Sequence, residues 1–229
     1  MVRHTFIFWS TVAIETHCLS LLSATMLALI WKARALYIWM QLERATRFLA
    51  SCISASRKSR IASAVALRTN TVVVLLENIN NEGNENAIVR SMDALGFQNL
   101  HRVRTPDISL QSRRPMRTDS GARNWITIHN WADITTCIKH LRDDCGYKVA
   151  VASPDASIPL SKVEFTQKFV VAFGNERNGV SDTLLRMSDL RFSLPMCGFV
   201  QSFNVSVAVA ITLYHAHMQR VQKLVSDKI

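Results

Sequence analysis

The chain has 229 residues, of which 48% are hydrophobic, so it can bury a sizeable core. Lysine and arginine total 27 against 17 acidic residues, a formal net charge of +10 at pH 7, which favours a polyanionic partner such as RNA, DNA or an acidic membrane surface. The five cysteines are odd in number and have no spacing suited to zinc, so we expect reduced core cysteines, an intracellular compartment and no metal site.

Residues 1–70 differ in composition from the rest of the chain. Only Glu15 and Glu43 are acidic there, whereas arginine, serine and alanine are frequent, which is typical of an organelle transit peptide. Two alternatives stay open: a helical extension that packs on the domain or a partner, and a membrane anchor. The anchor is disfavoured because the apolar run from Cys18 to Trp31 is shorter than the roughly 20 residues that span a bilayer. We assign residues 1–45 to this extension and expect a mitochondrial location, or otherwise a cytoplasmic one.

A basic helical segment at residues 46–70 is predicted to lead into the main domain. The stretch from Leu42 to Leu67 has a helical pattern throughout, and its lysines and arginines would form a cationic surface. We place the main domain at residues 71–222 and a short C-terminal tail at residues 223–229.

The main domain is predicted to begin with a buried strand. Residues 71–76, TVVVLL, form a β-branched apolar run typical of a strand buried on both faces of a parallel sheet. An Asn-rich loop at 77–86 follows, then a helical stripe that ends at Gly96, and another strand at Asn99–Arg104. This βαβ unit indicates an α/β fold with the loop at the carboxyl end of the strand, where such sheets bind ligands.

Two polar residues of this unit have ordinary structural interpretations. Asn84 is placed to cap the helix. Arg90 lies about 200° around the helix from Ile88, so it points away from the apolar stripe as a solvated arginine would. Position alone therefore assigns neither of them a function.

A polar, exposed loop is predicted at residues 105–124. Two prolines interrupt it and arginines crowd it, so contact with phosphates would explain its composition. Beyond it we predict a helix at Asp133–Leu141 and strands at Tyr147–Ala152 and Lys168–Phe173, again the alternation of an α/β fold. The arginines in and beside the loop are Arg102, Arg104, Arg113, Arg114, Arg117 and Arg123.

Two glycine-bearing turns follow the last predicted strands. Residues 174–179, GNERNG, match neither G-x-G-x-x-G nor the Walker pattern, and Glu176 is either a solvated turn acid or a carboxylate that accepts hydrogen bonds from a ligand. From Phe192 to Arg220 the pattern is a strand end, a turn, and a long helix capped by Ser202 or Asn204. Backbone N–H groups left unpaired in that turn make it either a ligand site or an ordinary connection.

In this order and separation, three stretches resemble the SpoU/TrmH branch of the SPOUT RNA methyltransferases. The first family motif is similar to Asn84-x-x-Ala87-Ile88-x-Arg90-x-x-Asp93-Ala94-x-Gly96. The second is similar to Phe173-Gly174-Asn175-Glu176-x-x-Gly179-Val180-Ser181. The third is similar to Leu194-Pro195-Met196-x-Gly198-x-x-x-Ser202-Phe203-Asn204-Val205-Ser206-x-Ala208. Two positions depart from the family: Gly83 stands where close relatives often carry histidine, and Phe203 replaces the usual leucine.

The resemblance implies a SPOUT-type parallel sheet flanked by helices, with a C-terminal deep trefoil knot and a homodimer formed through the knot region. It implies S-adenosyl-L-methionine as the cofactor and ribose 2′-O-methylation of RNA, either tRNA (guanosine) or rRNA, as the activity. The alternative is a catalytically weak or inactive RNA-binding or ribosome-assembly factor with the same fold, within a ribosomal assembly complex.

The family motifs also imply roles for particular residues. Arg90 would help to activate the ribose 2′-hydroxyl with the substrate phosphate, and because a guanidinium stays protonated at neutral pH we favour positioning and charge stabilisation over deprotonation. The implied catalytic residues are Arg90, Asn84, Glu176, Ser202 and Asn204. The implied cofactor-binding residues are Phe173, Gly174, Asn175, Glu176, Gly179, Leu194, Pro195, Met196, Gly198, Ser202, Phe203 and Asn204. The expected RNA-binding residues are Arg68, Arg90, Arg113, Arg114, Arg117 and Arg123.

Overall fold

The computed structural model describes residues 24–105 and 119–226, with side chains from 32 to 105 and from 119 to 223. The chain forms two compact units, residues 1–63 and residues 64–229. Three of the predicted RNA-binding residues, Arg113, Arg114 and Arg117, lie outside the described residues, as does most of the loop predicted at 105–124.

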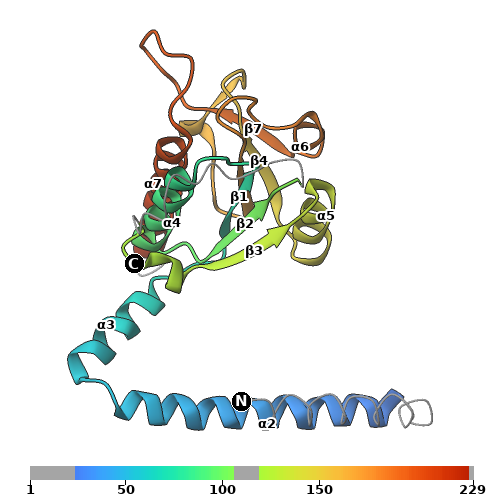
Figure 1. Cartoon of the computed structure of the whole chain (residues 1–229), viewed down its shortest axis with the longest axis vertical. Coiled ribbons are helices and arrows are strands. Elements are labelled where there is room, and N and C mark those ends of the chain that lie inside the picture. Colours follow the sequence, from blue (N-terminus) through green and yellow to red (C-terminus); the bar gives the residue numbers. More distant parts are fainter. Residues whose placement is uncertain (1–23, 106–118, 227–229) are drawn as a thin grey trace. The chain divides into compact units, whose positions relative to one another are not determined.

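The N-terminal unit is helical where it is described (Figure 1). Helix α2 spans Ala24–Ser51, and helix α3 spans Ala55–Ala66 and extends into the second unit. The prediction of one uninterrupted helix from Leu42 to Leu67 was therefore wrong. The chain leaves the helix at residues 52–54, and the hydroxyl of Ser54 accepts a hydrogen bond from the backbone N–H of Arg57 at 3.3 Å, which begins a new helix. No helix within the described ranges is long and apolar enough to cross a bilayer.

The second unit is built on a seven-stranded sheet in which every pair of neighbouring strands is parallel. The strand order is β3-β2-β1-β6-β4-β7-β5. The strands are β1 Val72–Glu77, β2 Asn99–Val103, β3 Thr127–Trp131, β4 Lys148–Ala152, β5 Ile158–Pro159, β6 Phe169–Phe173 and β7 Leu190–Ser193. The predicted strands are confirmed within a residue or two at their ends, whereas β3 and β5 were not predicted.

Helices cover both faces of this sheet (Figure 1). Helices α4 (Glu82–Leu95) and α7 (Val205–Ser226) pack against one face, where Val74 and Val171 lie in the same apolar cluster as Ile88 and Val209. Helices α5 (Ile134–Lys139) and α6 (Asp182–Arg186) cover the other face, which Leu75 contributes to. Short helical turns complete the unit at Ala122–Trp125, His140–Asp144 and Leu160–Lys162. The predicted α/β class is confirmed, and the knot stays a prediction.

Helix α4 begins and ends with clear signals. Asn81, and not Asn84, is its N-cap, because the Asn81 side chain accepts hydrogen bonds from the backbone N–H groups of Gly83 and Asn84 at 2.8 and 3.4 Å. The helix ends at Gly96 as predicted. Gly96 has φ 79°, and a Cβ there would lie 2.8 Å from the carbonyl oxygen of Leu67, so only glycine fits.

The cysteines are not uniformly core residues. Cys137 is fully buried, and burial raises the pKa of its thiol to about 12. Cys145 is half-buried, but Cys52 and Cys197 are exposed, so the prediction of core positions was wrong for those two. Cys18 lies outside the described residues.

Candidate functional site

Three polar loops leave the carboxyl ends of β1, β6 and β7. Strands β1 and β6 are neighbours in register, with Leu76 opposite Phe173, so the loop that leads into α4 lies beside residues 174–179. The carboxyl ends of parallel strands meet at one edge of a sheet, where α/β proteins hold their ligands. All three family-like motifs therefore contribute to the same edge.

A chain of side-chain hydrogen bonds joins the three loops. Asn84 Nδ2 donates to Glu176 Oε1 at 2.7 Å, and Asn204 Nδ2 donates to Asn84 Oδ1 at 3.1 Å. The side-chain oxygen of Asn204, Oδ1, accepts hydrogen bonds from the backbone N–H and the hydroxyl of Ser206 at 2.8 and 2.6 Å. Three predicted catalytic residues that are far apart in sequence are thus brought into direct contact.

The loop that carries Glu176 is closed on itself. Asn175 and Gly179 exchange two backbone hydrogen bonds, at 2.9 and 2.8 Å. The Asn175 side chain donates to the carbonyl of Asn78 at 2.7 Å and accepts from the N–H groups of Arg177 and Asn178. Both the side chain and the backbone of Asn175 are thus paired within the protein, and Asn175 holds the loop in its closed shape.

Gly174 stands where the two ends of that loop approach each other. A Cβ on Gly174 would lie 2.1 Å from the carbonyl carbon of Gly179, a distance that real Cβ atoms do not reach. The glycine is therefore required by the chain's own backbone. Phe173, the residue before it, is 2% exposed and packs edge-on against Phe192, so its ring belongs to the core.

The buried carboxylate of Glu77 binds the end of the loop that follows β6, at Ser181. Glu77, at the end of β1, is 3% exposed and accepts from the N–H and the hydroxyl of Ser181 at 2.8 and 2.6 Å. The Ser181 hydroxyl also accepts from the N–H of Leu184, so Ser181 is the N-cap of α6. Glu77 was not among the predicted residues, although an acid at the end of an apolar strand was the available signal.

The third loop, residues 194–204, leads into α7 and is largely exposed. Asn204 caps the helix, since its side chain accepts from Ser206 and its carbonyl accepts from Val207 and Ala208, so of the two predicted caps Asn204 is the right one. Ser202 is exposed and makes no hydrogen bond with any residue in the described ranges. The structure therefore does not join Ser202 to the polar chain of Asn84, Glu176 and Asn204.

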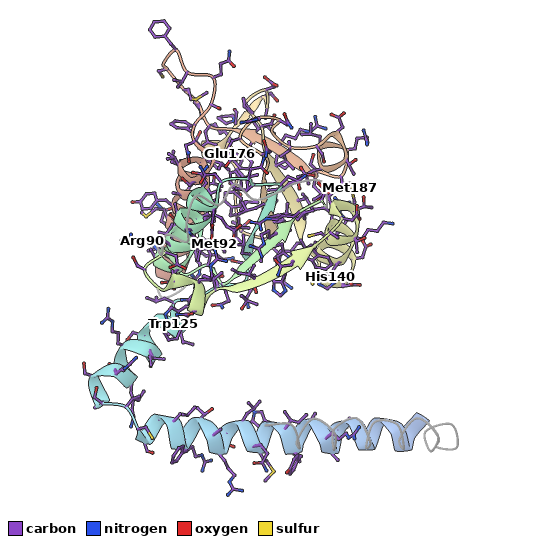
Figure 2. All side chains as sticks on the ribbon, viewed as in Figure 1. Arg90, Met92, Trp125, His140, Glu176 and Met187 are labelled. Atoms are coloured by element: carbon purple, nitrogen blue, oxygen red, sulfur yellow. The ribbon has the colours of Figure 1, made fainter. Side chains whose placement is uncertain are left out.

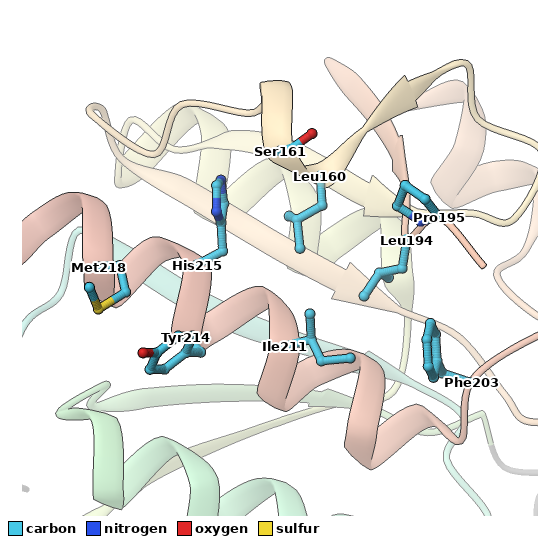
Figure 3. A pocket seen from close by; sticks show the side chains of 9 residues that line it. All are labelled: Leu160, Ser161, Leu194, Pro195, Phe203, Ile211, Tyr214, His215 and Met218. Atoms are coloured by element: carbon cyan, nitrogen blue, oxygen red, sulfur yellow. The ribbon is translucent and has the colours of Figure 1, made fainter. Parts of the chain in front are cut away.

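An apolar pocket lies beside the base of this loop (Figure 3). It has a volume of about 350 Å³, and the predicted cofactor-loop residues Leu194, Pro195 and Phe203 form part of its wall. The remaining lining residues come from α7 and from the turn at Leu160–Lys162: Leu160, Ser161, Ile211, Tyr214, His215 and Met218. The bulky Phe203 ring thus helps to line this pocket.

Arg90 lies apart from the polar chain. It follows Asn84 by six residues on α4, a rise of about 9 Å along the helix axis. Its side chain is exposed, as predicted, and is labelled in Figure 2 with Glu176. It forms no hydrogen bond or ion pair with any residue in the described part of the chain. With respect to the described residues the guanidinium is available to a ligand, but it does not contact Asn84 or Glu176.

Two other predicted RNA-binding arginines are occupied by internal contacts. Arg68 is paired with Asp93, and its side chain is 17% exposed. Arg123 donates to Asn86 Oδ1 at 2.9 Å and to Glu85 Oε1 at 3.2 Å. Both Arg68 and Arg123 therefore bind side chains of helix α4.

Glu85 lies next to Asn84 in the first turn of α4, and the sequence analysis did not identify it. Its side chain is 2% exposed and pairs with three guanidinium groups, those of Arg102 (2.8 Å), Arg104 and Arg123 (3.2 Å). Burial, together with the neighbouring Arg102 and Arg123, lowers the pKa of Arg104, and Glu85 opposes that shift. Arg102 and Arg104, which the sequence suggested as phosphate contacts, therefore hold α4 to β2.

Within the described residues no group of three His, Cys, Asp or Glu side chains could hold a metal ion. The parallel sheet and the three polar loops at its carboxyl edge define an α/β protein with a candidate ligand site at the ends of β1 and β6. The chain belongs to the SpoU rRNA Methylase family, whose model matches residues 71–214. The predicted family is confirmed, and with it the enzyme class, an RNA methyltransferase.

Relatives and solved structures agree with that family. The chain is 32% identical over 179 residues to a tRNA (guanosine(18)-2′-O)-methyltransferase of Borreliella burgdorferi, covering 75% of this chain and 77% of the relative. It is 31% identical over 173 residues to the enzyme of the same name from Thermus thermophilus, covering 76% and 88%. Among solved structures, the A. aeolicus TrmH/SpoU tRNA modifying enzyme superposes with a TM-score of 0.66 at 28% identity, covering 73% of this chain and 84% of that one.

Proposed function

We propose that this protein transfers a methyl group from S-adenosylmethionine to a ribose 2′-hydroxyl of RNA, with a tRNA guanosine as the substrate. The observation that carries the proposal is the hydrogen-bonded chain of Asn84, Glu176 and Asn204, which unites the three motifs of the family. Support for the substrate comes from the relatives, which are tRNA (guanosine(18)-2′-O)-methyltransferases at 31–32% identity. The family description names rRNA, which is the alternative substrate.

The residues at the sheet edge fit a cofactor that is held mainly by backbone. The exposed turn at residues 194–203 and the closed loop at residues 174–179 present main-chain groups without a bulky side chain at Gly174, Gly179 or Gly198. When bound, S-adenosylmethionine supplies an electrophilic methyl group. Phe173 and Asn175 would keep the cofactor loop in shape, because the Phe173 ring lies in the core and Asn175 is hydrogen-bonded to Gly179 and Asn78.

The chemistry requires an in-line approach and a destination for the hydroxyl proton. Glu176 is exposed and accepts from Asn84 through Oε1, so Oε2 is available to accept a hydrogen bond from a ribose hydroxyl. Asn84 fixes the carboxylate and is itself fixed by Asn204. Arg90, which is unpaired among the described residues, would bind a substrate phosphate and hold the nucleotide, since a guanidinium is already protonated at neutral pH and cannot take the hydroxyl proton.

The direct test is transfer of labelled methyl groups to total cellular RNA by the purified full chain, followed by mapping of methylated riboses. Arg90→Ala is expected to abolish or strongly reduce transfer. Arg186→Ala removes a charge from an exposed arginine on α6 and is the matched control. Methyl transfer to rRNA alone would replace the tRNA proposal. Intact RNA binding without any transfer would favour an RNA-binding or ribosome-assembly factor instead.

We also propose a homodimer formed through the knot region. The support is a row of exposed apolar side chains along α7, spaced as one face of a helix: Val207, Ile211, Tyr214, Met218 and Val221. Ile211→Asp should shift the sedimentation coefficient to that of a monomer, whereas Arg186→Asp should not. A wild-type chain that sediments as a monomer at all concentrations would contradict this proposal.

A mitochondrial location is proposed from the cationic, acid-poor N-terminal 70 residues. Fusion of those residues to a fluorescent protein should direct it to mitochondria, and sequencing of the mature N-terminus would establish whether residues 1–45 are retained. A diffuse cytoplasmic signal would instead favour the cytoplasm.

A further inference from the structure

Helix α2 carries an unusual number of exposed apolar side chains. Among its described side chains, from Lys32 onward, eight large apolar ones are more than half exposed, between 51% for Met40 and 69% for Phe48. They are Leu36, Tyr37, Ile38, Trp39, Met40, Leu42, Phe48 and Leu49. Contiguous exposed apolar surface of this kind marks a binding surface for another molecule or for a membrane.

The same helix and its neighbour are strongly cationic. The described side chains of α2 include Lys32, Arg34, Arg44 and Arg47 against one acid, Glu43, which Arg47 pairs with at 2.5 Å. Helix α3 adds Arg57, Lys58 and Arg60, contains no acidic residue and buries no side chain. The partner of this surface must therefore be both apolar and negatively charged.

The two kinds of side chain on α2 are partly segregated around its axis. At about 100° per residue, Ile38, Leu42 and Leu49 lie within about 40° of one another. Lys32, Arg44 and Arg47 lie at least about 100° away from Leu49, on the opposite side. Arg34 lies about 60° from Leu49, at the edge of the apolar face, where a long side chain can extend its charge to water. Leu36 and Met40 share the charged side.

We propose that α2 lies in the plane of an anionic lipid surface, with Ile38, Leu42 and Leu49 inserted among the acyl chains and the lysines and arginines at the phosphate head groups. A lipid interface satisfies both requirements at once, since basic residues contact anionic head groups while aliphatic ones leave water. RNA offers phosphates for the arginines but no place for the isoleucine and leucines. A protein partner would need an apolar groove bordered by acidic side chains, whereas an anionic bilayer presents both chemistries over its whole surface.

Surface docking requires no spanning segment, so it agrees with the finding that no described helix could cross a bilayer. The inference goes beyond methyl transfer, because it concerns where the enzyme works and leaves the polar chain of Asn84, Glu176 and Asn204 untouched. It predicts a peripheral protein that salt partly releases from membranes, because screening weakens the contribution of the basic residues.

The test is co-sedimentation of the full chain with vesicles of phosphatidylcholine, with and without phosphatidylserine. The double variant Ile38→Ser/Leu42→Ser should lower the partition coefficient for anionic vesicles at least about tenfold, because two buried aliphatic groups are lost. The control is Leu36→Ser/Met40→Ser, which has the same spacing and similar chemistry but lies on the charged side. We expect it to change the partition coefficient by less than about twofold.

Several outcomes would overturn the proposal. These are an absence of binding to anionic vesicles, equal loss from the two double variants, or a mature chain in cells that begins after Leu49. A drop in RNA affinity for Ile38→Ser/Leu42→Ser without a change in vesicle binding would assign the surface to RNA. A change in sedimentation coefficient alone would assign it to a protein partner. Methyl transfer to RNA in solution should be unchanged in both variants, so failure of this proposal is distinguishable from failure of the proposed activity.

Discussion

Asn84 and Glu176 are 92 positions apart in the sequence, yet the Asn84 side chain donates a hydrogen bond to Glu176 at 2.7 Å. Asn84 lies in the first turn of α4 and Glu176 in the loop after β6, so the contact joins the neighbouring strands β1 and β6 at their carboxyl ends. Because Asn204 also bonds to Asn84, the amide of Asn84 is held from both sides. Asn84 is therefore the centre of the candidate site.

Replacing Asn84 tests this arrangement. In Asn84→Asp the donor to Glu176 becomes a second carboxylate, and the two like charges repel. We expect the rate of methyl transfer at saturating substrates to fall on the order of 100-fold, because Glu176 is no longer oriented. Asn178→Asp places the same charge in the same loop but outside the hydrogen-bonded chain, and it should keep most of the activity. Similar losses in the two variants would mean that charge near the site matters, and not the contact with Glu176.

Gly174→Ala tests the close approach within the loop after β6. The added methyl would lie 2.1 Å from the carbonyl carbon of Gly179, so backbone must move. We expect a loss of about 2 kcal/mol in the free energy of unfolding and at least a tenfold weaker affinity for S-adenosylmethionine, measured by urea denaturation and calorimetry. Gly198→Ala is the control for stability, because a Cβ there meets no atom within 4 Å. Wild-type stability in Gly174→Ala would show that the loop can open without cost.

Much of the sheet could be predicted because its central strands are continuous apolar, β-branched runs. Every residue of Val72–Glu77 and of Phe169–Phe173 is buried, as expected for central strands of a parallel sheet that is covered on both faces. Strand β3, Thr127–Trp131, has only half-buried and exposed residues, and β5 has two residues, so neither carries a pattern of its own. Their pairing is supplied by β2 and β7, which a single-sequence pattern does not reveal.

In the candidate site, too, some residues could be predicted from the sequence and others could not. Asn84, Glu176 and Asn204 were identified through the family motifs, and the structure brings their side chains together. Glu85 was not, because an acid on a helix usually faces water and only the convergence of three distant arginines makes its burial tolerable. For the same reason the arginines at 102, 104 and 123 were interpreted from composition as contacts for phosphate.

Glu85→Gln should be strongly destabilising. The substitution preserves the shape of the side chain but leaves three guanidinium groups around a neutral amide, so the free energy of unfolding should fall by about 3 kcal/mol or more. Glu43→Gln removes a carboxylate from the surface pair with Arg47 and is the matched control, with an expected change of less than about 0.5 kcal/mol. Both are measured by urea denaturation at neutral pH. An equally small effect for Glu85→Gln would indicate that the arginines find other partners.

A row of aromatic rings gives the second unit a defined response to acid. The His101 ring is 5% exposed, stacks on His129 at 4.5 Å between ring centroids, and accepts a hydrogen bond from Trp131 Nε1 at 3.1 Å. Burial, and then the nearby His129 and His140, lower the pKa of His101 from 6.5 to about 4. His129 is shifted in the same direction by burial and by His140.

The sign of the pH dependence follows from that shift. Above pH 6.5 His101 is neutral in both states and costs nothing, whereas between pH 6.5 and 4 the unfolded chain binds a proton that the folded chain resists. Stability should therefore fall as the pH drops through this window, by up to about 3 kcal/mol for His101 alone. His101→Gln keeps an acceptor for Trp131 but does not titrate, so its free energy of unfolding should depend less on pH between 6.5 and 4 than that of the wild type. Parallel curves for the two proteins in urea denaturation would mean that other groups cause the acid sensitivity.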